Sequence, residues 1–358
     1  MPLDRRTFLK TAAVAATAAA TKTALGGSTQ ETLHFAIIGA GGQGQRITDY
    51  FAKVPGTRLT AICDINPLNV DTTKKSHSEA KVYEDWKEML DQERDLQAVL
   101  IGLPEHLHAP AAIDAMNAGK DVFCEKPMAY SVEQCRQMIA ARDKNQRILQ
   151  IGQQRRSNPL YYLAERLIQK DGVIGKVVRA DAFWDRWSDW KRPLPNLDKD
   201  FAKWGYPSLN HLINWRLYRE YGHGLMTENG THQMDACSWL LGGKLPRKVC
   251  GLGVAKYNDG RETHDVCSAE YLFEGDTIVR FTQDFHQGFN YGWGFGELFL
   301  GEDGSLRINQ QQELAVYDKR GNEEKVSIAK LGDIELGGVL SESKKLVELE
   351  QQPRGLLY

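Results

Sequence analysis

A glycine-rich loop between an apolar segment and a helical pattern limits the fold of this chain more than any other feature. Residues 35–38 are apolar, and residues 39–44 read Gly-Ala-Gly-Gly-Gln-Gly. In this pattern the first glycine permits a tight turn, the second admits a pyrophosphate and the third lets helix and strand pack closely. Asp64 ends a second apolar segment, twenty residues after the last glycine. The sequence therefore predicts a dinucleotide site that contains Gly39, Gly41, Gly42, Gln43, Gly44 and Asp64.

Asp64 also bears on the choice of dinucleotide. A carboxylate at this position accepts hydrogen bonds from the ribose hydroxyls and repels a 2′-phosphate. NAD is therefore the expected cofactor, although Asn66 or a distant arginine leaves NADP open.

Apolar segments alternate with helical patterns up to residue 152, which predicts a doubly wound parallel sheet. Beyond residue 154, strand-like segments dominate, and Glu274-Gly275 is typical of a hairpin between two of them. The expected fold class is α/β, with an N-terminal Rossmann domain and a C-terminal α/β domain whose open sheet is mostly antiparallel.

The change in the pattern of helical and strand-like segments also sets the expected domain boundaries. They are 1–30 for a signal peptide and linker, 31–153 for the Rossmann domain, 154–345 for a substrate-binding and oligomerisation domain, and 346–358 for a tail. The abrupt ending leaves open whether a C-terminal piece is missing.

The first residues predict export by the Tat translocase. Arg5 and Arg6 precede Phe-Leu-Lys and an alanine-rich run over residues 11–20. Tat carries folded proteins, so a cofactor is loaded before export to the periplasm. Because free NAD(H) is scarce there, we expect the nucleotide to be tightly bound and re-oxidised within each catalytic cycle.

Composition argues against several other classes of protein. The net charge is −2 and no basic block follows the leader, so a nucleic-acid partner is not expected. A membrane span is not expected, because no run of about 18 apolar residues follows the leader. The six cysteines lack Cys-x-x-Cys spacing and are expected to be buried free thiols. His232, His264, His286, Glu228 and Asp265 lack tight ligand spacing, so no metal site is expected.

A candidate catalytic loop follows the apolar segment 121–124. It reads Glu125-Lys126-Pro127 and lies at the expected carboxyl end of the fifth strand, where open α/β sheets bind ligands. A lysine there can hold a substrate hydroxyl and share its proton as hydride leaves. The following proline allows a cis bond. Taken alone, the same three residues are equally typical of a surface turn.

The chain resembles the glucose–fructose oxidoreductase / inositol dehydrogenase / MocA (Gfo/Idh/MocA) family from about residue 33 to 308. The resemblance rests on the glycine loop and on the segments 103–108, 118–127 and 222–235. It implies a Rossmann domain followed by an α/β domain whose open sheet often forms a dimer or tetramer. It also implies nicotinamide-side contacts from Leu103, Pro104, His108 and Glu125, although His108 is equally suited to cap a helix.

The resemblance assigns acid/base chemistry to the segment 222–235. His232 matches a substrate-contacting histidine, while Glu228 stands where relatives carry aspartate, and His223 interrupts the glycine run. Residues four apart share a helix face, so Glu228 can support His232, and Lys126 completes the proton handling. The alternatives are a structural imidazole for His232 and helix capping or a core hydrogen bond for Glu228. The departures indicate a non-standard substrate.

Tryptophans gather in one insertion. Five of the eight lie between residues 184 and 215, interleaved with charged side chains. Aromatic faces pack on the C–H faces of sugars, so Trp190, Trp215 and Arg216 are candidate substrate contacts. A small core that packs the insertion on the sheet is the alternative. The acidic balance argues against single-stranded nucleic acid.

These features together predict an exported NAD(P)-dependent oxidoreductase that acts on a sugar, cyclitol or glycoside and retains its cofactor. In one version a second sugar takes the hydride back. In another, transient oxidation supports elimination, hydration and reduction, so that the enzyme is a glycoside hydrolase. A conventional dehydrogenase with an external acceptor and a non-catalytic sugar-binding module remain as further alternatives.

Overall fold

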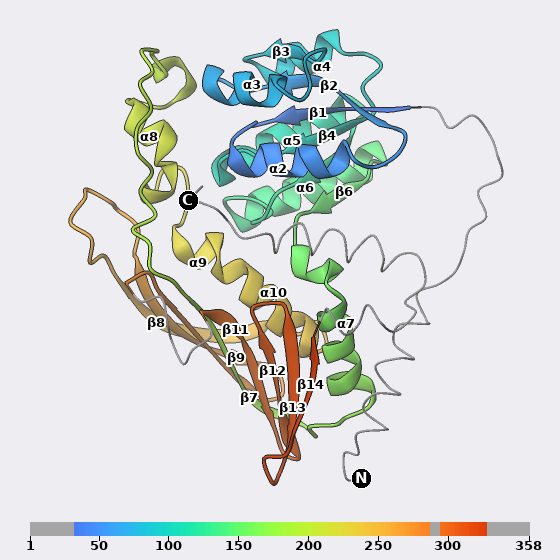
Figure 1. The fold of residues 1–358 in the computed structure, drawn as a ribbon, viewed down its shortest axis with the longest axis vertical. Helices are drawn as coiled ribbons and strands as arrows, with labels where there is room; N and C mark the ends of the chain where they lie inside the picture. Colours follow the sequence, from blue (N-terminus) through green and yellow to red (C-terminus); the bar gives the residue numbers. More distant parts are fainter. Residues whose placement is uncertain (1–31, 287–293, 328–358) are drawn as a thin grey trace, which may run out of the picture. The chain divides into compact units, whose positions relative to one another are not determined.

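The computed structural model describes residues 32–286 and 294–327 (Figure 1). Within them the chain forms two compact units: residues 32–152 with 193–223, and residues 153–192 with 224–286 and 294–327. The predicted signal peptide and the tail at 346–358 lie outside the described residues. The expected C-terminal domain, 154–345, is interrupted, because residues 193–223 belong to the unit that contains the glycine loop. We call residues 193–223 the crossing segment.

The first unit is built on a six-stranded sheet in the order β3-β2-β1-β4-β5-β6, and every neighbouring pair is parallel. The predicted doubly wound sheet is confirmed. The strand order reverses between β1 and β4, and this switch point is where such sheets bind ligands. The strands are β1 Leu33–Ile38, β2 Thr57–Cys63, β3 Lys81–Tyr83, β4 Ala98–Ile101, β5 Asp121–Cys124 and β6 Leu149–Ile151.

Helices make the central strands of this sheet nearly inaccessible. The residues Phe35–Ile38 of β1 and Val99–Ile101 of β4 are at most 1% exposed, as expected where helices cover both faces of a parallel sheet. Side chains cap the connecting helices: Asp85 accepts from Lys87 N, and Ser131 accepts from Gln134 N. The helices are α2 Gly42–Phe51, α3 Pro67–Lys74, α4 Trp86–Gln92, α5 His108–Asn117 and α6 Val132–Asn145, with the 3₁₀ turn η1 Glu105–Leu107 before α5.

The crossing segment has an aromatic core of its own. The core consists of Phe201, Tyr206, Trp215 and Tyr221, which are buried together, and Ile65, in the loop after β2, packs against them. Its short helices are η4 Ala202–Trp204, α8 Leu209–Ile213 and η5 Trp215–Leu217. Figure 1 shows α8 and its flanking turns as a separate layer of the unit.

The second unit contains an eight-stranded sheet in the order β14-β13-β12-β11-β7-β10-β9-β8. Neighbouring strands of this sheet are antiparallel, except for the parallel pair β7 and β10. The predicted mostly antiparallel sheet is therefore confirmed. The predicted hairpin joins β9 to β10, with φ +83° at Gly275. The strands are β7 Val177–Asp185, β8 Pro246–Val254, β9 Val266–Phe273, β10 Ile278–Asp284, β11 Phe295–Gly301, β12 Gly304–Asn309, β13 Glu313–Asp318 and β14 Glu323–Ser327.

Helices cover one face of this sheet. Val279 and Phe281 of β10 are buried in the core that includes α7 and α10, whereas Ile278 and Arg280, which point the other way, are exposed. Figure 1 shows α7 and α10 on the same side of the strands. The helical elements are η2 Gln154–Ser157, α7 Pro159–Glu165, the π-helical turn η3 Arg166–Lys170, α9 Leu225–Glu228 and α10 Gly230–Leu240.

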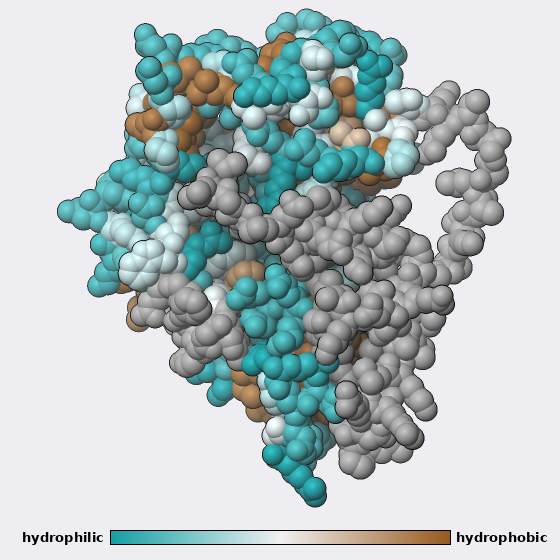
Figure 2. Space-filling model, viewed as in Figure 1, coloured by the Kyte–Doolittle hydropathy of each residue, from teal (hydrophilic) through white to brown (hydrophobic). Residues whose placement is uncertain are grey.

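The described surface and the cysteines agree in part with what the composition predicted. Hydrophilic residues dominate the described surface drawn in Figure 2. No helix in residues 32–286 or 294–327 is long and apolar enough to cross a membrane. All six cysteines are free thiols, and four of them are buried as expected. Cys135 is partly exposed and Cys250 is exposed, because β8 forms the edge of the sheet.

Candidate active site

The glycine loop after β1 makes contacts that only glycine permits. Gly39 has φ +86°, and a Cβ placed there would lie 2.8 Å from the Gly102 backbone. A Cβ on Gly44 would lie 1.8 Å from the Gly39 carbonyl oxygen. The start of α2 is therefore held tightly against the loop and the end of β4.

Gly41 and Gly42 occupy a more open place at the N-terminus of α2. A Cβ on Gly42 would meet nothing within 4 Å, and one on Gly41 would meet only the Asn69 side chain at 3.9 Å. Gly41 supplies no side-chain cap, and the first turn carries no acidic residue. Because the first N–H groups and the dipole of a helix favour anions, this end of α2 fits the pyrophosphate of a dinucleotide.

Asp64 is tied to the glycine loop. Its Oδ2 accepts from Ala40 N at 2.7 Å and from Asn69 Nδ2 at 3.1 Å, and its Oδ1 accepts from Asn66 N at 2.7 Å. Burial raises the pKa of the Asp64 carboxyl, while these hydrogen bonds oppose the rise. A carboxylate offers about four lone-pair sites, so three protein donors leave capacity for a ribose hydroxyl.

Glu125 connects the glycine loop to the candidate catalytic loop. Its carboxylate is buried and accepts from Gln43 Nε2 at 3.0 Å and from Lys126 N at 3.2 Å. The Lys126–Pro127 bond is cis, as the motif allowed. Lys126 therefore stands on a backbone that is fixed to the loop suited to bind phosphate.

His108 braces the same loop from the other side. The ring is 1% exposed, with Nδ1 2.7 Å from Pro127 O and Nε2 2.9 Å from Leu103 O. Both neighbours are carbonyl acceptors, and only one of them can receive a proton from a neutral imidazole. His108 thus joins the Leu103-Pro104 loop to the Glu125-Lys126-Pro127 loop and does not serve as the N-cap of α5, which is Leu107.

The second unit holds the other proposed catalytic residues. Glu228 is the last residue of α9 and His232 lies in the first turn of α10, so the two are on successive helices rather than on one. Both side chains are buried. The N-cap positions are Gly224 and Asn229, so Glu228 occupies neither.

His232 stacks on an aromatic wall at the end of β7. The rings of His232 and Trp184 are 5.6 Å apart with an interplanar angle of 24°, and Phe295 stacks on Trp184 at 4.7 Å. Arg186 lies over Trp184 at 5.5 Å and over Phe285 at 5.2 Å. Trp184 and Phe285 are 6% and 0% exposed, so the wall is a packed support for His232, while Arg186 beside it is partly exposed.

A buried ion pair supports this wall. Arg155 and Glu297 are 1% and 0% exposed and form a salt bridge, and Tyr161 donates to Glu297 at 2.8 Å. The Arg155 guanidinium lies 5.9 Å from the Trp184 ring. Its neighbour Arg156 pairs with Asp235 at 2.8 Å on the surface. Both arginines thus form ion pairs within the second unit.

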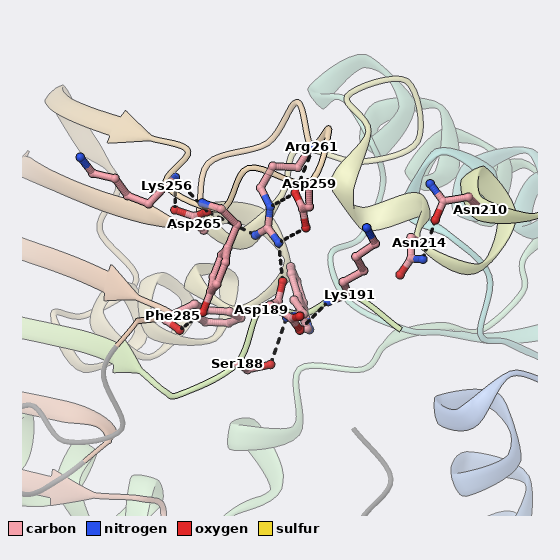
Figure 3. A network of polar contacts seen from close by, with 12 residues as sticks. Ser188, Asp189, Lys191, Asn210, Asn214, Lys256, Asp259, Arg261, Asp265 and Phe285 are labelled. Atoms are coloured by element: carbon pink, nitrogen blue, oxygen red, sulfur yellow. Dashed lines mark hydrogen bonds and ion pairs between the residues drawn. The ribbon is translucent and has the colours of Figure 1, made fainter. Parts of the chain in front are cut away.

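A polar network holds the loop that carries Trp190 (Figure 3). Arg261 donates to Asp189 O at 2.6 Å and to Asp259 at 2.7 Å. It also lies 3.4 Å from Asp265, which is fully buried and accepts from Lys256 N at 2.9 Å. Trp190 itself has φ +61° and packs edge-on against Phe285. The network fixes Trp190 beside the aromatic wall.

Trp215 and Arg216 lie in the other unit. Trp215 is 7% exposed within the core of the crossing segment, and the Arg216 guanidinium stacks 4.1 Å from its ring. The structure therefore gives Trp215 the core role that the sequence left open as an alternative.

Two family models match this chain. The model "Oxidoreductase family, NAD-binding Rossmann fold" matches residues 33–153, and "GFO/IDH/MocA C-terminal domain" matches residues 162–307. The chain belongs to the Gfo/Idh/MocA oxidoreductase family. Its first unit is accordingly an NAD-binding Rossmann fold.

Known members of the Gfo/Idh/MocA family show how far the similarity extends. The chain is 34% identical over 148 residues to inositol 2-dehydrogenase from Salmonella typhimurium, which covers 40% of this chain and 44% of that protein. It is 28% identical over 223 residues to 2,7-anhydro-N-acetylneuraminate hydratase from Mediterraneibacter gnavus, covering 62% and 53%. The aldose–aldose oxidoreductase from Caulobacter crescentus, crystallised with glycerol, superposes with a TM-score of 0.66 at 24% identity over 89% and 96% of the chains.

Sequence reasoning did not assign roles to Trp184 and Glu297. Trp184 was one of five tryptophans in the insertion, and it was not singled out as a substrate contact. Its position at the end of a strand, β7, was the feature that could have indicated a special role. Glu297 lies 142 residues from Arg155, so no local spacing pointed to their pairing.

Proposed function

We propose that this Gfo/Idh/MocA member is an NAD-dependent oxidoreductase that transfers hydride from a sugar or cyclitol carbon. The observation that carries the proposal is the chain of contacts from Gln43 through Glu125 to Lys126. These contacts tie the loop that carries Lys126, which His108 also braces, to the glycine loop after β1, and they support a role for Lys126 beside the nucleotide.

Each residue of the nucleotide side has a distinct proposed task. The N-terminus of α2 binds the pyrophosphate, and Asp64 accepts hydrogen bonds from the adenine ribose. NAD supplies the hydride acceptor when it is bound. Lys126 donates a hydrogen bond from its ammonium group to the substrate hydroxyl oxygen. It stabilises the negative charge on that oxygen as His232 takes the proton and hydride leaves the carbon. Glu125 orients the Lys126 backbone.

In the second unit we propose His232 as the acid/base group and Glu228 as the residue that supports it. Stacking on Trp184 fixes the plane of the imidazole. Trp190 and Arg186, which are partly exposed, are the proposed sugar contacts, since aromatic rings pack on C–H faces while the guanidinium binds hydroxyls. The names of the relatives, which concern inositol, an aldose and an anhydro-sugar acid, support a polyhydroxylated ring as substrate.

We further propose export through the Tat pathway and tight retention of the nucleotide. Arg5 and Arg6 support the first, and the scarcity of NAD(H) outside the cytoplasm supports the second. Retention requires that hydride returns within the cycle, either to a second sugar or to an intermediate of the same substrate. The similarity to a hydratase favours keeping the redox-neutral route, and with it the NAD-dependent glycosidase, as the second candidate.

One experiment separates these functions. The mature protein is purified, its nucleotide is released by heat and identified, and the holoenzyme is incubated without added cofactor. Paired lactone and polyol products from two sugars support the oxidoreductase, whereas aglycone release from chromogenic glycosides supports the hydrolase. Turnover that occurs only with a continuous supply of NAD would contradict retention.

Lys126→Met tests the proposed catalytic role of the lysine directly. General acid–base groups contribute about 10²–10⁴-fold to rate, so we expect a loss of that size with NADH binding retained. Substrate binding without turnover in the wild-type protein would favour the non-catalytic module.

A further inference from the structure

The crossing segment begins with lysines that bind at the carboxyl ends of β2 and β3. Lys199 Nζ donates to Ile65 O at 2.9 Å, and Ile65 is the residue after Asp64. Lys199 also forms an ion pair with Glu84, the residue after β3, and Lys203 Nζ lies 3.4 Å from the same carboxylate. The positive charge of Lys199 is close enough to oppose the rise in the pKa of Asp64 that burial causes. This end of the segment therefore borders the proposed ribose site.

The later part of the segment binds at the carboxyl end of β4. The His106 ring lies 6.2 Å from Tyr206 and 5.2 Å from Tyr221, both in the aromatic core of the segment. Glu105 Oε1 accepts from His223 N at 2.5 Å. These contacts tie the segment to η1, the turn that follows β4.

The last contacts are with the loop that follows β5. Tyr130 donates its hydroxyl proton to Arg219 O at 2.6 Å, and its ring lies 4.0 Å from the His223 ring at an interplanar angle of 37°. The segment is thus anchored at β3 and β2 on one side of β1 and at β4 and β5 on the other. The glycine loop belongs to β1, between the two sets of anchors.

We propose that the crossing segment forms the outer wall of the dinucleotide site at its adenosine end and slows release of the nucleotide. The inference rests on the proposed NAD function and adds the element that retains the cofactor. Ligands of doubly wound sheets bind outside the carboxyl ends of the strands at the switch point. A segment anchored on both sides of that point limits the path of the nucleotide to solvent. Lys199 and Lys203 are the anchors nearest the ribose.

The test measures the rate at which NADH leaves the protein. Wild-type protein, the double variant Lys199→Ala/Lys203→Ala and the single variant Glu84→Ala are loaded with NADH, and dissociation is followed by fluorescence during a chase with excess NAD. We expect at least a tenfold faster dissociation in both variants. The control is Lys81→Ala, which removes an ion pair with Glu93 on the same sheet edge, at 2.8 Å, and should leave the rate unchanged.

Two results would overturn the proposal: wild-type dissociation rates in both anchor variants, or equal acceleration in Lys81→Ala. A wild-type protein that binds no NADH would instead contradict the proposed function. Hydrogen exchange of the wild-type protein gives a second readout that needs no substitution. NADH should slow amide exchange in residues 193–223, and unchanged exchange at saturating NADH would also overturn the proposal.

Discussion

The two halves of the candidate machinery are built by different means. In the Rossmann unit the backbone shapes the site, through glycines that admit no Cβ, a carboxylate bound to main-chain N–H groups and a histidine between two carbonyls. In the second unit side chains shape it, through stacked rings and a buried ion pair. The first kind of site constrains residue identity strictly, because any side chain at Gly39 or Gly44 would collide with backbone atoms, which no substitution of a neighbour can remove. The second kind leaves room for change in the substrate pocket.

Gly44→Ala tests the backbone-built half most severely. The new Cβ would lie 1.8 Å from the Gly39 carbonyl, so α2 must move away from the loop. We expect NADH binding in a fluorescence titration to be lost. Gly42→Ala is the control, since its Cβ meets no protein atom within 4 Å. It should keep the wild-type melting temperature while weakening NADH binding. Normal NADH affinity in Gly44→Ala would contradict the backbone-built site.

Arg155→Met tests the side-chain-built half. Removing one partner of a buried ion pair leaves an uncompensated charge and costs about 3–5 kcal/mol. We expect a loss of that size in the free energy of unfolding from urea denaturation. The adjacent variant Arg156→Met breaks an exposed pair and should cost about 1 kcal/mol or less. Equal losses in the two variants would show that burial of the Arg155–Glu297 pair carries no special weight.

His106 gives the Rossmann unit a dependence on pH. Burial in the aromatic core lowers the pKa of His106 to about 4, from an ordinary value of 6.5. The unfolded chain therefore binds a proton first as pH falls, and stability is lost between about pH 6.5 and 4. The loss of unfolding free energy has an upper bound of about 3.4 kcal/mol, and solvent access to the partly exposed ring makes it smaller. Urea unfolding at several pH values should show a smaller loss in His106→Gln; identical pH profiles would exclude His106 as the source.

Glu84→Gln should produce the smallest effect. The substitution removes the negative charge that balances Lys199 and Lys203 beside Asp64, so a 2′-phosphate meets a more positive surface. We expect the ratio of NADPH to NADH dissociation constants to fall severalfold. Asp49→Asn, which changes a charge on α2 away from these lysines, is the control. An unchanged ratio in Glu84→Gln would place the lysines too far from the ribose to affect specificity.

Local sequence patterns predicted the doubly wound parallel sheet and the position of the Glu125-Lys126-Pro127 loop, whose proline allowed a cis bond. These features depend on residues close together in the chain, where spacing and apolar runs carry the information. The patterns did not predict β12, β13 and β14. They also could not reveal that residues 193–223 join the first unit, or that Arg155 pairs with Glu297, because such contacts join distant segments whose local composition is compatible with several partners. Trp215 shows the same limit, since a tryptophan in a core and one in a pocket look alike in sequence.

The return of the chain to its first unit affects the order of events during synthesis. When residues 1–152 have left the ribosome, all six strands of the Rossmann sheet have been made, but not the lysines and tyrosines of the crossing segment that contact the loops after β2, β3 and β4. Those arrive only after β7, the first strand of the second unit, has emerged. If the crossing segment slows nucleotide release as proposed, a nascent chain can bind NAD once the Rossmann sheet has formed but holds it tightly only after residue 223 has been made.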